Sequence, residues 1–257
     1  MTDLAVIYEH PAWFEPLWAA LDRHGVAYDR ISITDHVFDP GGSPPPAPVI
    51  FSRVAMSSFL REPEHPIFYA RSLFSHWERA GARVVNGTPT LAIDTSKADQ
   101  VGLIRSLGLH APETRAVHRA KDLARAARGL RFPVLVKADI GGAGAGIARY
   151  DTPEELAAAA VAGTTPVGVN GVSLVQEYAP RRGDKITRVE VLEGRALYAL
   201  DVFSGGDAFD LCPADACLAQ PGKAAVRMAR AEAPPEAVAG AEAILRAAGV
   251  DVGGVEY

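Results

Sequence analysis

Long apolar runs and cationic leader segments are both missing from this sequence of 257 residues. No run approaches the roughly 18 consecutive apolar residues that a membrane-spanning helix needs. The opening stretch MTDLAVIYEHPAWF lacks the cationic start and apolar core of a signal peptide. We therefore expect a cytoplasmic protein.

Surplus basic charge is missing as well. Asp and Glu outnumber Lys and Arg by 31 to 26, which gives a net charge of −5, and no local cluster of basic residues offsets it. Binding to nucleic acid or to an anionic membrane depends on a basic surface. Neither is expected as a partner.

Cysteine is scarce, since only Cys212 and Cys217 occur, in LCPADAC. Two thiols cannot fill a zinc site by themselves, and no CxxC motif is present. We expect reduced thiols that bind no metal, and a redox or substrate-contact role stays open. Histidines such as His10, His65 and His118 show no metal-ligand spacing, so we interpret them as structural.

Apolar segments of two different periods alternate in the first part of the chain. Strands are predicted over 3–8, 26–33, 47–54 and 82–87, and amphipathic helices over 10–25 and 66–81. Phe68, Leu73, Phe74 and Trp77 are expected on the inner side of the second helix. Strands that alternate with helices form a parallel sheet, so an α/β layer of about four strands is predicted.

The remainder of the chain has a different pattern. Helices are predicted over 95–107, 120–130, 151–163 and 234–249, and strands over 132–138, 172–178 and 250–257. Residues 186–203 divide at EGR into two alternating apolar runs, which is typical of a β-hairpin. This part is therefore predicted to be α+β.

A lysine precedes a run of small residues in FPVLVKADIGGAGAGIARY. Lys137 ends an apolar strand, and residues 141–146 follow as GGAGAG. Glycines let backbone N–H groups approach phosphate oxygens and permit the positive φ values that point these groups the same way. A lysine adds a point charge for phosphate. The pattern suits a triphosphate, and an ordinary glycine turn is the alternative.

Two common glycine motifs do not fit this run. The Walker pattern GxxxxGK[ST] is absent because the lysine precedes the glycines. Gly142, Gly144 and Gly146 give GxGxG followed by a strand, whereas the dinucleotide fingerprint is GxGxxG followed by a helix. A ligand here is therefore expected under a β-hairpin.

Polar residues also stand at the ends of other segments. Lys97 begins a helix in DTSKADQ, Gln176 and Glu177 end an apolar strand, Asp184 follows them, and Glu256 ends the final strand. A strand end can offer backbone groups to an adenine edge, and an acid can accept from ribose hydroxyls. A carboxylate at a strand end is a suitable metal ligand.

In this order, four stretches resemble the ATP-grasp superfamily: VNGTPTLAIDTSKADQVGLIRSLGLHAPET, FPVLVKADIGGAGAGIARY, LVQEYAPRRGDKITRVEV and VGGVEY. The resemblance extends from about residue 84 to the end, and the preceding α/β layer looks like that superfamily's N-terminal domain. It is most similar in character to carboxylate–amine ligases such as D-alanine–D-alanine ligase and the ribosomal-protein glutamate ligases.

The resemblance implies an N-terminal α/β domain followed by α+β ATP-grasp subdomains with an antiparallel sheet. The N-terminal domain would span 1–94. A small subdomain with a glycine-rich flap would span 95–180, and a C-terminal subdomain would span 181–257.

The resemblance also implies roles for individual positions. Lys97 and Lys137 would contact ATP phosphates, Asp184 would contact the ribose, and Glu256 would be the first acidic Mg²⁺ ligand. The flap would comprise Gly141, Gly142, Ala143, Gly144 and Gly146, and the adenine hinge would comprise Gln176, Glu177, Tyr178 and Ala179.

Arg188 is the catalytic candidate, placed by the resemblance near the phosphates or the substrate carboxylate. The alternative is a plain cross-strand ion pair with Glu190. In similar ligases a second acid and an asparagine on a later strand complete the metal site. This sequence stops one residue after Glu256, so we expect the C-terminal part of the fold to be truncated.

Ser52 and Arg53 follow a strand of the predicted parallel sheet, at the edge where open α/β sheets bind ligands. They are candidates for a substrate carboxylate clamp, and a salt-bridged loop is the alternative. Residues 205–222 have an unusual composition and are interpreted as a specificity loop.

The implied activity is an ATP-dependent ligation of a carboxylate to an amine through an acylphosphate, with Mg²⁺ as cofactor and release of ADP and phosphate. The substrates would be small-molecule or peptide acids and amines, and a homodimer stays open because dimers are frequent among similar ligases. Two alternatives remain: a kinase of the same fold, and a nucleotide-binding protein without turnover.

Overall fold

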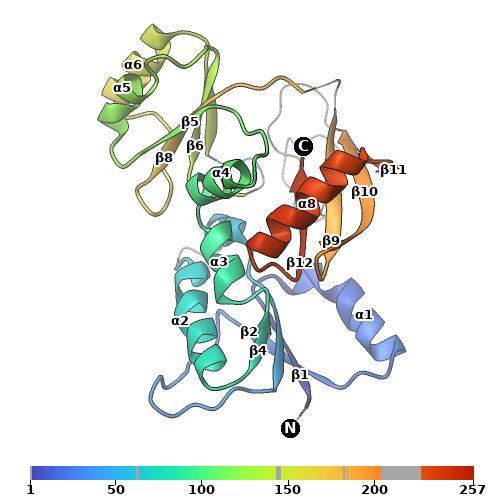
Figure 1. The fold of residues 1–257 in the computed structure, drawn as a ribbon. Coiled ribbons are helices and arrows are strands. Elements are labelled where there is room, and N and C mark those ends of the chain that lie inside the picture. The colour runs from blue at the N-terminus through green and yellow to red at the C-terminus, as the bar shows by residue number, and fades with distance from the viewer. Residues whose placement is uncertain (1, 62–63, 143–145, 182, 184, 204–226) are drawn as a thin grey trace.

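The computed structural model describes residues 2–61, 64–142, 146–181, 183, 185–203 and 227–257. Three sheets of four strands organise these residues, and Figure 1 shows them as separate units along the chain. The first sheet is parallel and the other two are antiparallel, as the sequence predicts.

The first unit is the α/β layer. Its sheet has the order β2-β1-β3-β4, with β1 (Leu4–Tyr8), β2 (Tyr28–Ser32), β3 (Val49–Arg53) and β4 (Arg83–Val85). The helical segments are η1 (Pro11–Trp13), α1 (Glu15–Arg23), η2 (Met56–Leu60) and α2 (Pro66–Arg79). Helix α2 buries Leu73, Phe74 and Trp77 against the sheet, as predicted.

One expectation for α2 is wrong, because Phe68 is 46% exposed. The buried face of the helix contains Ile67, Ala70 and Leu73. These residues are three positions apart and therefore lie on one side of the helix. Phe68 follows Ile67 by one position, so its side chain points about 100° away from that side.

The second unit has the sheet order β5-β8-β6-β7. Its strands are β5 (Thr114–Val117), β6 (Val134–Ala138), β7 (Ile147–Tyr150) and β8 (Ser173–Glu177). Segments η3 (Ala120–Asp122), α5 (Leu123–Ala126) and α6 (Pro153–Ala162) accompany them. Helix α6 begins where Thr152 Oγ1 accepts a hydrogen bond from Glu155 N, and it ends at Gly163 in the left-handed conformation.

The third unit has the sheet order β11-β10-β9-β12. Its elements are β9 (Lys185–Leu192), β10 (Arg195–Phe203), β11 (Arg227–Ala231), α8 (Pro235–Ala247) and β12 (Val252–Glu256). The predicted hairpin is present, because Glu193 and Gly194 both have positive φ, as a tight turn between twisted strands requires. Helices α3 (Thr88–Asp94) and α4 (Lys97–Ser106) connect the first unit to the second.

Asn86 joins the first unit to the third. It has a φ of 55°, and its amide oxygen accepts hydrogen bonds from the N–H groups of Asp251 and Val252 at 3.1 and 3.0 Å. Its amide nitrogen donates to the carbonyl of Val252 at 2.7 Å. Asn86 therefore fixes the start of β12, the strand that carries Glu256, against the end of β4.

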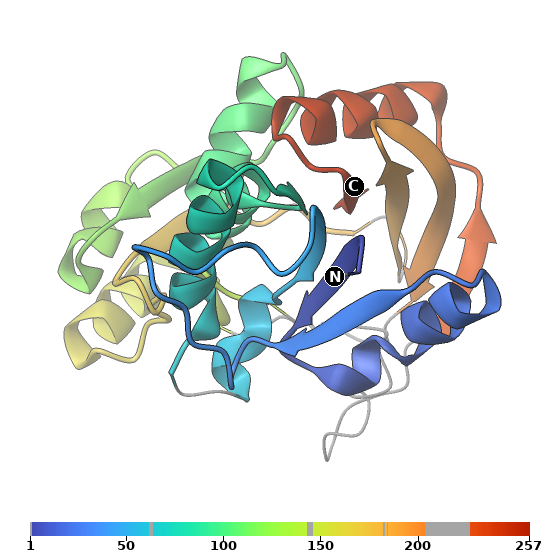
Figure 2. The same ribbon diagram turned by 90° about the horizontal axis from the view of Figure 1, so that it is seen from below.

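Figure 1 shows the second and third units both at one end of the α/β layer, and in Figure 2 they lie on opposite sides of the view, with the C-terminal residue near the middle. No helix within the described ranges is long and apolar enough to cross a membrane.

Candidate active site

A cavity of about 650 Å³ lies where the three units meet. The carboxyl end of β3, the end of α3, the start of the glycine run, β9 and β12 all contribute to its wall. The polar and glycine residues that line it include Ser52, Arg53, Asp94, Gly141, Gly142, Arg188 and Glu256. The structure therefore brings the predicted substrate pair Ser52 and Arg53 into one space with Arg188 and Glu256.

The two predicted phosphate-binding lysines lie at the root of the glycine run. Lys97 Nζ donates to the carbonyl oxygens of Asp139 and Gly141 at 3.0 and 3.4 Å. Lys137 Nζ donates to Gln176 Oε1 at 2.6 Å. Both ammonium groups thus donate only to acceptors that carry no charge, two for Lys97 and one for Lys137, among the residues that the structure describes.

Burial and mutual repulsion lower the pKa of Lys137. Removal from water is the larger cause, the charge of Lys97 adds to it, and the pKa falls to about 8. Burial also lowers the pKa of Lys97, against the opposing effect of Asp139 and Asp94. Because the two positive charges repel each other, a bound anion would stabilise both of them.

The glycine run is packed too closely for a side chain at Gly142 and at Gly146. A Cβ on Gly142 would lie 3.0 Å from the Cβ of Ser57 in η2. Gly146 has a φ of 69°, and a Cβ there would lie 2.9 Å from the Cβ of Ala138. The predicted flap residues Ala143 and Gly144 lie outside the described residues.

Asp139 is a structural member of this site that the sequence reasoning missed. Its carboxylate is buried and accepts hydrogen bonds from Ala98 N at 3.0 Å and Asn170 Nδ2 at 2.9 Å, with Ser96 Oγ at 3.4 Å. It therefore caps the N-terminus of α4, where Lys97 is located. An acid between a buried strand and a glycine run was the available signal.

Asp139→Asn is expected to lower the free energy of unfolding by about 2–3 kcal/mol, because charge-assisted hydrogen bonds weaken and the new amide group faces the Asn170 amide. Urea denaturation measures the change. Asp122→Asn is the control, since its ion pair with Arg125 is exposed and contributes little. Equal losses in the two variants would show that Asp139 does not hold α4.

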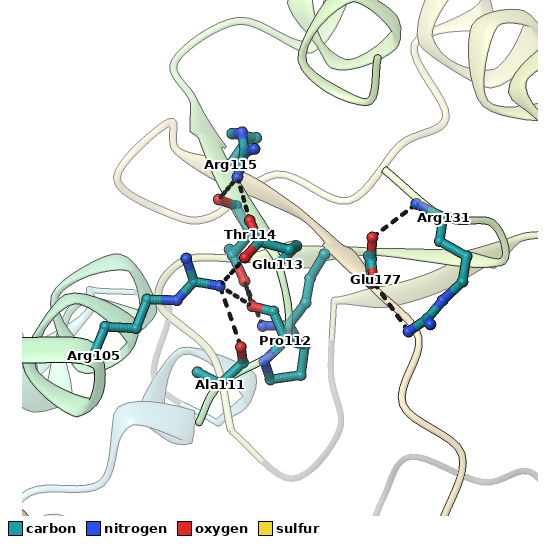
Figure 3. A network of polar contacts seen from close by, with 9 residues as sticks. Arg105, Ala111, Pro112, Glu113, Thr114, Arg115, Arg131 and Glu177 are labelled. Atoms are coloured by element: carbon teal, nitrogen blue, oxygen red, sulfur yellow. Dashed lines mark hydrogen bonds and ion pairs between the residues drawn. The ribbon is translucent and has the colours of Figure 1, made fainter. Parts of the chain in front are cut away.

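The predicted adenine hinge lines a second cavity, of about 300 Å³. Its wall contains His110, Ala111, Pro112, Tyr178 and Ala179, together with Arg131 and Glu177, which lie beside each other. Figure 3 shows how ion pairs hold this wall. Glu177 accepts from the backbone N–H of Arg131 at 2.8 Å and from its guanidinium at 3.1 Å.

Arg105 of α4 holds another part of that wall. Its guanidinium donates to the carbonyl oxygens of Ala111 and Pro112 at 3.2 Å each and to the carboxylate of Glu113 at 2.8 Å (Figure 3). Gln176 does not line this cavity: it connects Lys137 to Thr114 Oγ1, to which it donates at 2.8 Å. Gln176 therefore positions a lysine, and the hinge interpretation depends on the other three residues.

Arg188 binds two carboxylates at the edge of the main cavity. Its guanidinium lies 2.5 Å from Glu190 on the same strand and 3.1 Å from Glu256 on β12, which is the residue directly opposite in the sheet. The ion pair with Glu190 is therefore not a cross-strand pair. Burial opposes the charge of Arg188, yet the two carboxylates raise its pKa overall.

Gly254 makes room for that guanidinium, since a Cβ there would lie 2.6 Å from Arg188 Nε. Among the residues that the structure describes, no three acidic, histidine or cysteine side chains gather as a metal cluster. Asp184, the predicted ribose contact, lies outside the described residues.

No protein-family model and no curated protein sequence matches this chain. Solved structures do. The ATP-grasp ligase PsnB in complex with a minimal precursor is 16% identical, with 100% of this chain and 86% of that chain covered and a TM-score of 0.67.

A RimK domain ATP-grasp protein from Sphaerobacter thermophilus is also 16% identical, with coverages of 98% and 84% and a TM-score of 0.69. For a D-alanine–D-alanine ligase from Bacillus anthracis the identity is 13%, the coverages are 100% and 82%, and the TM-score is 0.66. The chain therefore has the fold of the ATP-grasp ligases, as the order of its sequence motifs predicts.

Proposed function

We propose that this protein is an ATP-dependent carboxylate–amine ligase. The observation that carries the proposal is the position of Lys97 and Lys137, which are near enough for the charge of Lys97 to lower the pKa of Lys137. Lys97 also binds the carbonyl of Gly141, which lines the cavity that contains Arg53 and Arg188. Two ammonium groups without a carboxylate contact suit a triphosphate, and the cavity beside them has space for a second substrate.

ATP would lie between the second and third units. Lys97 and Lys137 would neutralise its phosphates, and the flap over 141–146 would cover them. Glu177, Tyr178 and Ala179 would hold the adenine in the smaller cavity, and Asp184 would accept from the ribose. Solved neighbours include the Bacillus anthracis ligase in complex with ATP and PsnB in complex with Mg and ADP, which supports both ligands.

The chemistry would proceed in two steps. An oxygen of the acid substrate attacks the γ-phosphorus, ADP departs, and a mixed anhydride forms between carboxylate and phosphate. The amine then attacks the carbonyl carbon, and the C–O bond to phosphate breaks with its electron pair on phosphate. Lys97, Lys137 and Arg188 contribute by positioning the phosphates and neutralising charge. Exclusion of water by the flap would protect the anhydride from hydrolysis.

The main cavity offers a carboxylate, that of Glu256, that suits Mg²⁺. This ion is usually bound through one or two carboxylates together with substrate phosphates, and Glu256 lines the cavity with a side chain that is 52% exposed. Glu256 would hold the ion, which would supply charge neutralisation at the phosphates. Ser52 and Arg53 would hold a substrate carboxylate.

The test is whether ADP formation needs two co-substrates. Purified protein is given ATP, Mg²⁺ and pairs drawn from panels of acids and amines. Peptides belong in the acid panel because a structure of PsnB contains a precursor peptide. A ligase releases ADP only when acid and amine are both present. ADP release with a hydroxyl acceptor alone would indicate a kinase, and ATP binding without any ADP would indicate a protein without turnover.

A further inference from the structure

Asp94 is a charged residue of the main cavity that the proposed roles leave unused. It is the last residue of α3, and its side chain contributes to the cavity wall together with Arg53 and Arg188. Within the described ranges, its carboxylate makes no hydrogen bond and no ion pair within 4.0 Å. A carboxylate that faces a cavity without a partner is available to a ligand.

The surroundings of Asp94 do not neutralise it by contact. Burial raises the pKa of Asp94, and Arg188, Arg53 and Lys97 oppose that rise through their charges. Arg188 is already occupied, because it binds Glu190 and Glu256. Lys97 is held by the carbonyl oxygens of Asp139 and Gly141.

Arg53 is the matching free cation. Across the part of the chain that the structure describes, its guanidinium contacts no carboxylate, and it lies 5.8 Å from the centre of the Trp13 ring. The main cavity thus holds one acid and one base, each without a contact partner of opposite charge. A zwitterion satisfies both, since it carries a carboxylate and an ammonium group on neighbouring atoms.

We propose that the amine substrate is an amino acid, whose carboxylate binds Arg53 and whose ammonium group binds Asp94. This inference rests on the proposed ligase activity and assigns Asp94 the role of proton acceptor. One proton passes from the ammonium group to the Asp94 carboxylate, which frees the lone pair of the nitrogen. The C–N bond forms as the C–O bond to phosphate breaks, and the second proton leaves with the phosphate.

Asp94 is exposed to the space of the cavity, and its raised pKa favours this proton transfer, because a carboxylate with a higher pKa is a stronger base. After the transfer, Arg53 still neutralises the substrate carboxylate, so the amino acid stays in place as its nitrogen becomes nucleophilic.

The experiment compares two nucleophiles on the same activated acid. Hydroxylamine is neutral at pH 7 and traps an acylphosphate as a hydroxamate, so it needs neither an ammonium site nor a proton acceptor. The second nucleophile is each of the proteinogenic amino acids in turn, with methylamine and ethylamine as amines that lack a carboxylate. The acid is the one that gives the strongest hydroxamate signal with the wild-type protein.

For Asp94→Asn we expect kcat/KM for the amino acid to fall by about 100-fold and hydroxamate formation to stay within about threefold of wild type. Asp94→Ala serves as a second variant, and Asp99→Asn, an exposed acid of α4, is the control that should change neither rate. Thermal unfolding verifies that each variant is folded.

Three outcomes would overturn the inference. Asp94→Asn and Asp94→Ala could form the amide at the wild-type rate, they could lose hydroxamate and amide formation equally, or methylamine could serve as well as any amino acid. In each case the wild-type protein still forms hydroxamate, so the ligase proposal stands. A wild-type protein that forms no hydroxamate from any acid would instead contradict the ligase proposal itself.

Discussion

Lys137→Met is expected to weaken ATP binding by about 100-fold, because a charge-assisted contact to phosphate contributes about 2–3 kcal/mol. Methionine keeps the length and apolar stem of lysine and removes only the charge and the donors. Calorimetric titration with ATP measures the loss. Lys121→Met is the control, since Lys121 is exposed in η3 of the same unit and should leave the affinity unchanged. Equal affinity of the Lys137 variant and the wild type would remove Lys137 from the phosphate site.

The wild-type affinity for ATP should also depend on pH. Burial and the charge of Lys97 lower the pKa of Lys137 to about 8 in the free protein. Above that pH the free protein loses the ammonium group that ATP needs. The affinity is therefore expected to fall as pH rises through about 8, and the Lys137→Met variant should lack this decrease.

The same variant is expected to be more stable than the wild type at pH 7. The unfolded chain holds the Lys137 proton with a pKa near 10.5, whereas the folded protein releases it at about 8. Between these values the unfolded state binds more protons, so the stability of the wild type rises with pH. Below a pH of about 8, the positive charge on Lys137 lowers the free energy of unfolding by roughly 3 kcal/mol.

Methionine removes that cost but leaves Gln176 Oε1 without its donor, which costs about 1 kcal/mol. The net expectation is a gain of about 1–2 kcal/mol at pH 7 that disappears near pH 10.5. Urea denaturation at the two pH values measures it. A variant that is less stable than the wild type at pH 7 would mean that Lys137 serves the fold and not a ligand.

The sequence predicts the individual elements well where a single segment contains the whole signal. The alternation of strands and helices in the first unit and the turn at Glu193 and Gly194 are local patterns, and the structure contains both. Phe68 shows the limit, because its exposure depends on a rotation of one residue about the axis of α2. Helix α3 was not predicted, since Thr88–Asp94 is too short to show a period.

Contacts between distant segments were beyond the sequence reasoning. Asn86 binds residues 165 and 166 positions later, and Asp139 caps a helix that begins about 40 positions earlier. Both are polar residues in short connections, and neither belongs to a periodic pattern. The motifs predicted which residues are chemically suited to ATP, whereas connections of this kind between distant segments bring Gly141, Arg188 and Glu256 to the wall of one cavity.

Substitutions of Glu256 and Glu190 can be compared directly to test whether Glu256 binds Mg²⁺. Both carboxylates bind the guanidinium of Arg188, at 3.1 and 2.5 Å, and their side chains are 52% and 24% exposed. Glu256 lines the main cavity, whereas Glu190 is absent from its wall. A substitution that acts only through Arg188 should therefore give similar results at both positions, and a loss of metal binding should appear at Glu256 alone.

Glu256→Gln is expected to lower turnover by at least about 100-fold at limiting Mg²⁺, because an amide oxygen is a weaker ligand for this ion than a carboxylate. Binding of ATP without Mg²⁺ should stay within about threefold of wild type, since the lysines that bind the phosphates are unchanged. Glu190→Gln should leave the Mg²⁺ concentration for half-maximal turnover unaltered. If both variants lose turnover equally and added Mg²⁺ restores neither, Glu256 acts by orienting Arg188, and the metal must be held by other groups.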